Sequence, residues 1–166
     1  MRYPGEVTFS HMFVYESSPV RRVLNLDGFE KATLCVARHL FATFHHPSEQ
    51  CWMSAFMEAE RAFPPPFGAT IAHGITIAIR EMSKERCRAF SYFRCDDPLS
   101  ETATTREEQY LLMTLRGIRR HDHQMARAHA LLVCDGGDSD AFLAAIERVC
   151  LITGDVQQIR YQKSDK

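Results

Sequence analysis

The amino-acid sequence predicts a mainly α fold, a single domain built as an irregular bundle of about six helices. Apolar residues recur at steps of three and four in several stretches, and this spacing places side chains on one face of a helix. Capping and turn residues separate the stretches, and 166 residues suffice for one core. The domain is expected to span residues 1–155, with a strand-like arm at 1–24 and a polar, frayed tail at 156–166.

Composition and charge exclude several classes of protein. The chain is 45% hydrophobic and 25% charged, as in ordinary globular proteins, and no apolar run is long enough to span a bilayer. The net charge of −1 gives no electrostatic reason for binding nucleic acid or anionic lipid. Six cysteines without a signal-peptide pattern favour reduced thiols in the cytoplasm.

The N-terminal part is expected to supply one strand before the helices begin. Residues 7–15 alternate between larger apolar and other side chains, the period of a half-buried strand. The other β-prone run is 88–93, so the two are candidate partners in a short two-stranded β-ribbon laid on the helices. A first helix is predicted over 29–44, and Pro47 and Ser48 close it.

The next two helices differ in the size of their side chains. The second carries an aromatic and methionine stripe typical of core packing, made of Trp52, Met53, Phe56, Met57 and Phe63. A stiff connector of three prolines follows at 64–66. The third helix, 67–84, is rich in glycine and alanine, which permit close approach of neighbouring helices. It is therefore expected to be the central helix.

Thr105 and Glu108 form a capping box that starts the fourth helix. If this helix continued unbroken, Asp122 and His129 would fall on its apolar seam, where a buried charge is costly. A break at 119–122 is therefore predicted, with Asp122 as the N-cap of a fifth helix.

The fifth helix is expected to end at Gly136-Gly137, because glycine accepts the left-handed conformation at this position. Asp138, Ser139 or Asp140 would cap a sixth helix. The predicted core of the whole domain consists of Val36, Leu40, Trp52, Phe56, Ile71, Ile75, Leu111, Leu115, Ile118, Leu132, Ile146 and Val149.

The densest group of candidate binding residues lies at the predicted break. Arg119, Arg120, His121 and His123 form a basic cluster. Cations at the end of a helix are favoured by its dipole, which accounts for the cluster without a ligand. The functional alternative is contact with an acidic partner or a phosphate group.

Eight histidines and six cysteines raise the question of a metal site. No C-x-x-C or H-E-x-x-H pattern is present, and no glycine-rich phosphate loop follows a strand. His121-Asp122 resembles the dyad of the HD-type phosphohydrolases, but over these two residues only. The cysteines on helical faces are interpreted as small apolar core residues.

No catalytic template is matched, so the sequence favours a non-enzymatic protein without a cofactor. The leading hypothesis is a small cytosolic regulatory or adaptor module that binds a protein partner or associates with itself, with nucleic acid and membrane as unfavoured partners. The alternative is a metal-binding protein or metal-dependent hydrolase that uses some of the histidines.

Overall fold

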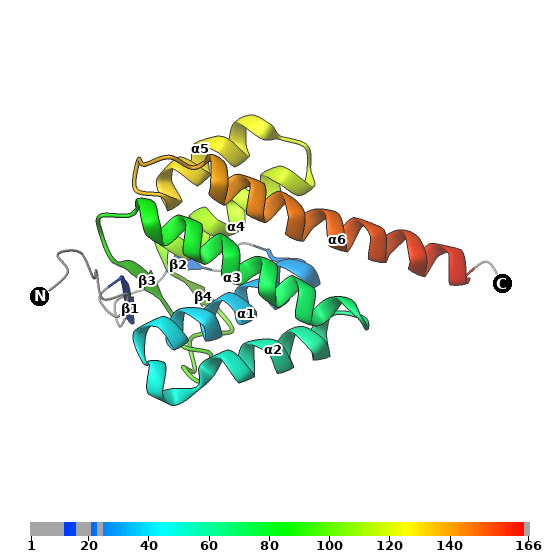
Figure 1. Cartoon of the computed structure of the whole chain (residues 1–166), viewed down its shortest axis with the longest axis horizontal. Coiled ribbons are helices and arrows are strands. Elements are labelled where there is room, and N and C mark those ends of the chain that lie inside the picture. The colour runs from blue at the N-terminus through cyan, green and yellow to red at the C-terminus, as the bar shows by residue number, and fades with distance from the viewer. Residues whose placement is uncertain (1–11, 16–20, 23–24, 165–166) are drawn as a thin grey trace, which may run out of the picture.

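The computed structural model describes residues 12–15, 21–22 and 25–164. It is 68% helical, with six helices, which confirms the mainly α prediction (Figure 1). The helices are α1 (Gly28–His45), α2 (Cys51–Ala62), α3 (Phe67–Glu85), α4 (Arg106–Arg119), α5 (His123–Val133) and α6 (Asp140–Ser164), with a 3-10 turn at Pro47–Glu49. The strands are β1 (Phe13–Tyr15), β2 (Arg21–Arg22), β3 (Phe90–Tyr92) and β4 (Ala103–Thr104). In the part of the chain that is described, no helix combines the length and the apolar character needed to cross a membrane.

The expected ribbon is present as a parallel pair of strands, with Phe13 opposite Phe90 and Tyr15 opposite Tyr92. Residues 7–11 of the predicted strand lie outside the described residues. A second small sheet, which the sequence pattern did not predict, pairs β2 with β4 in the antiparallel sense.

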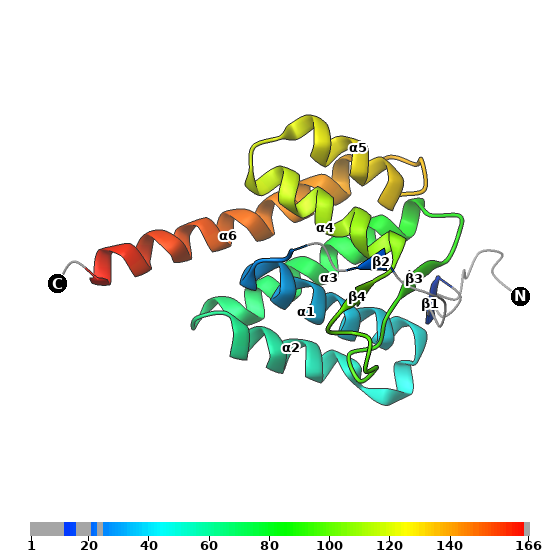
Figure 2. The ribbon, with the colours of Figure 1, turned by 180° about the vertical axis from the view of Figure 1, so that it is seen from behind.

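Helix α3 occupies the middle of the bundle, as its small residues predicted. It contacts α2 on one side and α6 on the other (Figures 1 and 2). Two of its glycines lie where these helices come closest. A Cβ atom on Gly68 would lie 2.7 Å from the Glu60 Cα, and one on Gly74 would lie 2.7 Å from the Val149 Cγ2. Both positions therefore favour a residue without a side chain.

The predicted capping box and break between α4 and α5 are both confirmed. Thr105 and Glu108 cap α4 reciprocally, and the Asp122 carboxylate accepts a hydrogen bond from the Met125 N–H at 3.0 Å. His121 takes a left-handed conformation (φ 57°) that turns the chain between the helices. A Cβ on Gly117 would lie 2.7 Å from the Ala126 backbone nitrogen, so α4 and α5 pack with their backbones in close approach.

The end of α5 differs in detail from the prediction. The left-handed residues are Asp135 (φ 59°) and Gly136 (φ 86°), so the first residue of the turn is an aspartate and not a glycine. The Asp135 carboxylate pairs with Arg88, which holds it in place. Helix α6 begins at Asp140 and its backbone continues to Ser164, while the expected fraying of the tail stays a prediction.

Two members of the predicted core are exposed, and the prediction was wrong for them. Trp52 is 50% exposed and Leu132 is 49% exposed, while Phe56 is half-buried. Helix α2 buries its small residues Ala55 and Ala59, which leaves Trp52, Met53 and Met57 exposed on the outer face. Leu132 was predicted on the inner face of the fifth helix together with Val133, but α5 buries Ala126, Ala130 and Val133, which leaves Leu132 on its outer side. The other nine residues of the predicted core are buried.

Replacing Asp122 with alanine is expected to lower the free energy of unfolding by about 1 kcal/mol, because the Met125 N–H loses its acceptor. Asp122→Asn and Asp122→Ser keep an acceptor oxygen and are expected to restore most of this loss. Urea denaturation measures all three variants, with Gln124→Ala as an exposed control in the same turn. An asparagine variant as unstable as the alanine variant would show that the negative charge, and not the cap, is what α5 requires.

Candidate metal centre

The structure divides the predicted basic cluster. Arg120, His121 and His123 are exposed at the turn between α4 and α5. Arg119 instead reaches the beginning of α1, where its guanidinium contacts the Asp27 carboxylate at 2.6 Å and lies 4.6 Å from the centre of the Phe29 ring. Arg119 thus has an internal structural role, and binding of an acidic partner by the cluster stays a prediction.

The histidines are spread over the fold, and His11 lies outside the described residues. The rings of His45 and His46 stack at 4.2 Å at the end of α1, where an imidazolium is favoured by the helix dipole. His129 contacts the backbone oxygen of Met125 one turn earlier in α5. His39 differs from these, because it lies beside two cysteines from separate parts of the chain.

Helix α1 supplies two of the three side chains of this group. Cys35 and His39 are one helical turn apart, so both project from the same face of α1. Both are half-buried, on the side of α1 that faces the loop after β3. That loop, residues 94–102, brings Cys95 against them.

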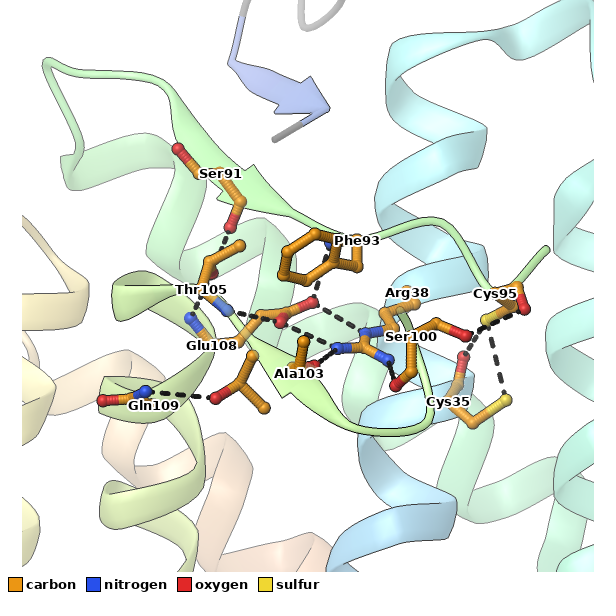
Figure 3. A network of polar contacts seen from close by, with 11 residues as sticks. Cys35, Arg38, Ser91, Phe93, Cys95, Ser100, Ala103, Thr105, Glu108 and Gln109 are labelled. Carbon is orange, nitrogen blue, oxygen red and sulfur yellow. Dashed lines mark hydrogen bonds and ion pairs between the residues drawn. The ribbon is translucent and has the colours of Figure 1, made fainter. Parts of the chain in front are cut away.

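A buried arginine on α1 holds the loop in position. Arg38, 4% exposed, lies between Cys35 and His39 in the sequence. Its guanidinium donates hydrogen bonds to the backbone oxygens of Ser100 at 2.6 Å and Ala103 at 2.7 Å (Figure 3). These contacts attach both the loop and β4 to α1, so the position of Cys95 relative to Cys35 depends on Arg38.

The charge of Arg38 is balanced by Glu108, which is fully buried. Arg38 Nε and Nη2 donate to the two Glu108 carboxylate oxygens at 2.8 and 2.9 Å. The same carboxylate accepts hydrogen bonds from the backbone N–H groups of Phe93 at 3.1 Å and Thr105 at 2.9 Å (Figure 3). Every charged group in this network is therefore paired, which a buried ion pair requires.

Further contacts fix the two ends of the loop. The Ser100 hydroxyl donates to the Cys95 backbone oxygen at 3.1 Å, and the Tyr15 hydroxyl of β1 donates to Asp97. Arg94 bridges Asp96 at 3.0 Å and Glu49 at 3.2 Å. The cysteine thus stands on a loop fastened to α1, to β1 and to the turn after α1.

The three side chains form a compact group of soft ligand atoms. The sulfur atoms of Cys35 and Cys95 lie 3.6 Å apart. One ligand atom from each of Cys35, His39 and Cys95 can be chosen so that all three lie within 4.8 Å of one another. Among the described residues, no other set of three or more histidine, cysteine or acidic side chains converges in this way.

Three carboxylates lie close enough for their charges to act on the group, Glu58 on Cys35, Asp96 on His39 and Glu108 on Cys95. Each is already paired with an arginine, Glu108 with Arg38. Arg61 donates to the two Glu58 oxygens at 3.0 and 2.6 Å, and Arg94 donates to the two Asp96 oxygens at 3.0 and 3.3 Å. The two thiols and the imidazole form no salt bridge of their own among the described residues, and they face one another.

The two thiols differ in acidity. The contact between the two sulfur atoms lowers the pKa of Cys35, against the effect of burial, and the neighbouring His39 lowers it further. The same contact between the sulfurs raises the pKa of Cys95, and burial raises it again. The contact thus shifts the pKa values of the two thiols in opposite directions.

Part of this group was visible in the sequence. The spacing of Cys35 and His39, four residues apart in a predicted helix, indicates a shared face. Cys35 is one of the helical cysteines that the sequence pattern led us to interpret as small apolar core residues. Cys87 is exposed and is not part of the group. Cys95 comes from 60 residues further along the chain, and no local pattern joins it to α1.

No protein-family model, curated protein or solved structure matches this chain. The function of the group therefore has to be inferred from its own geometry and chemistry.

Proposed function

We propose that this protein binds a zinc ion through Cys35, His39 and Cys95. The distance between the two sulfur atoms supports this proposal most directly. Two thiolates bound to one tetrahedral zinc ion, each at about 2.3 Å, lie roughly 3.8 Å apart. The sulfurs of Cys35 and Cys95 lie 3.6 Å apart, so they could hold the ion with almost no change in their separation.

The choice of metal follows from the ligand atoms. Thiolate sulfur and imidazole nitrogen favour zinc over magnesium and calcium, which prefer oxygen ligands. Arg38 and its hydrogen bonds to the loop would hold the ligands at the required spacing. Holding the loop in this way favours binding, because less of its freedom is lost when the ion arrives.

Three protein ligands leave one position of a tetrahedral ion for a water molecule or another small ligand. Glu58 and Asp96 are acidic candidates for this position, but each is engaged by an arginine. The proposed site therefore leaves one coordination position of the zinc ion open to water or another small ligand. The chain is proposed to act in the cytoplasm, where thiols stay reduced and available to a metal.

The protein, purified without a histidine tag, is expected to contain close to one zinc ion per chain by elemental analysis. Replacement by cobalt should produce the absorption bands of a tetrahedral, thiolate-bound ion. Cys35→Ser, Cys95→Ser and His39→Gln should each lose the ion. Cys87→Ser and His73→Gln change exposed residues outside the group and should retain it.

Circular dichroism on each variant separates loss of the ion from loss of the fold. Folded wild-type protein that takes up no zinc or cobalt would contradict the proposal. Retention of the ion by all three ligand variants would also contradict the zinc-binding proposal.

Binding of a macromolecular partner is a second candidate function, favoured by one observation. The outer face of α2 exposes three large apolar side chains in two turns, with Trp52 at 50%, Met53 at 45% and Met57 at 67%. Apolar residues grouped on a surface are typical of protein-binding faces. This face is a stronger candidate for a protein contact than the basic turn, where Arg119 is engaged internally.

A further inference from the structure

The contact between Cys35 and Cys95 has a second chemical use. At 3.6 Å the two sulfur atoms touch, so no other group separates them. A disulfide bond requires a distance of about 2.05 Å, and the sulfurs need to approach by only about 1.5 Å to form it. Cys35 lies on a regular helix, whereas Cys95 lies on a loop, so the approach can be made by the loop.

We propose that Cys35 and Cys95 are a site of reversible oxidation, at which a hydroperoxide converts the two thiols into a disulfide. The ion-release part of this inference rests on the proposed zinc site. The two states exclude each other, because both need the same sulfur atoms. A disulfide sulfur carries no negative charge and is a poor ligand for zinc. Oxidation would leave His39 as the single remaining protein ligand, and the ion would dissociate.

The reaction is balanced by a hydroperoxide as the oxidant. One cysteine sulfur, as the thiolate, attacks the outer oxygen of the peroxide, the O–O bond breaks, and water or an alcohol leaves. The sulfenic acid formed is then attacked by the second sulfur, the S–O bond breaks, and water leaves. With hydrogen peroxide, two thiols and one peroxide give one disulfide and two water molecules. A dithiol reductant reverses the reaction by thiol–disulfide exchange.

The two cysteines are accessible to a small oxidant, and their oxidation would join the loop covalently to α1. Cys35 and Cys95 are both half-buried, which leaves them open to a molecule as small as a peroxide. The loop is held to α1 by hydrogen bonds from Arg38, and the disulfide would add a covalent bond beside them. By contrast, the sulfur of Cys134 is buried in the core, away from solvent.

The test follows zinc and thiols together in the full chain. Reduced, zinc-loaded protein is titrated with hydrogen peroxide, while a chromogenic chelator reports free zinc and a thiol reagent reports the remaining thiols. The expected result is the release of one zinc ion per chain together with the loss of the Cys35 and Cys95 thiols, ahead of the other thiols. Peptide mapping should identify a Cys35–Cys95 crosslink. A dithiol reductant should restore the two thiols, and zinc added afterwards should bind again.

The variants separate the two proposals. Cys35→Ser and Cys95→Ser should form no internal disulfide, whereas Cys87→Ser should behave as the wild type. If the chain binds no zinc but still forms the Cys35–Cys95 crosslink, the oxidation site stands and the zinc site fails. If it binds zinc but peroxide yields no such crosslink at the point where the other thiols have reacted, the zinc site stands and the present inference is overturned.

Discussion

Glu108→Ala is expected to lower the free energy of unfolding by about 3–5 kcal/mol, because it leaves the buried Arg38 guanidinium without a counter-charge. It also removes the acceptor for two backbone N–H groups, those of Phe93 and Thr105. Urea denaturation gives the change directly. Glu101→Ala removes an exposed carboxylate from the preceding loop and should change stability by less than about 0.5 kcal/mol.

Glu108→Gln refines the same test, because glutamine keeps the size of the side chain and removes its charge. Its stability is expected to fall between those of the wild type and the alanine variant. Both variants should also weaken zinc binding if they remain folded, since Arg38 positions the loop that carries Cys95. An alanine variant as stable as the Glu101 control would show that Arg38 finds another partner and that the pair does not support the fold.

Phe41→Ala is expected to have an effect of similar size, about 3–5 kcal/mol, through loss of buried apolar contact. The Phe41 side chain is fully buried on α1, and its ring centre lies 4.6 Å from that of Phe90 and 5.1 Å from that of Phe13. It therefore joins the helix to both strands of the parallel sheet. Thermal and urea unfolding of the purified variant measure the loss.

Trp52→Ala is the matched control for Phe41→Ala, because it removes a larger ring from the exposed outer face of α2. Its expected effect on stability is below about 0.5 kcal/mol. A Trp52 variant that loses as much stability as the Phe41 variant would contradict the observed division between buried and exposed aromatic residues.

The helices could be predicted because their signals are local. The capping box at Thr105 and Glu108 and the N-cap at Asp122 each depend on residues within one turn. Which apolar residues face inward was harder to predict. Trp52 has the larger apolar side chain, yet α2 buries Ala55 and Ala59, where it lies so close to α3 that a Cβ on Gly68 would be 2.8 Å from the Ala59 oxygen.

The candidate site was less predictable than the fold, for the same physical reason. Glu108 was identified from its local partner Thr105, but its pairing with Arg38 joins residues 70 positions apart. The same is true of Cys35 and Cys95. Such contacts are created by the arrangement of α1 against the loop after β3, and no short sequence pattern contains them.

The parallel pairing of β1 with β3 has a consequence for the order in which the protein is assembled during its synthesis. The chain between Tyr15 and Phe90 contains all of α1, α2 and α3. At a synthesis rate of about 5–20 residues per second, Phe13 emerges roughly 4–15 seconds before its partner strand. The helical hairpins need only neighbouring residues and can form during this interval, whereas closing so long a loop is slow. The N-terminal strand can therefore pair only after α1, α2 and α3 have been synthesised, and it then covers the Phe41 and Phe44 rings that α1 already presents.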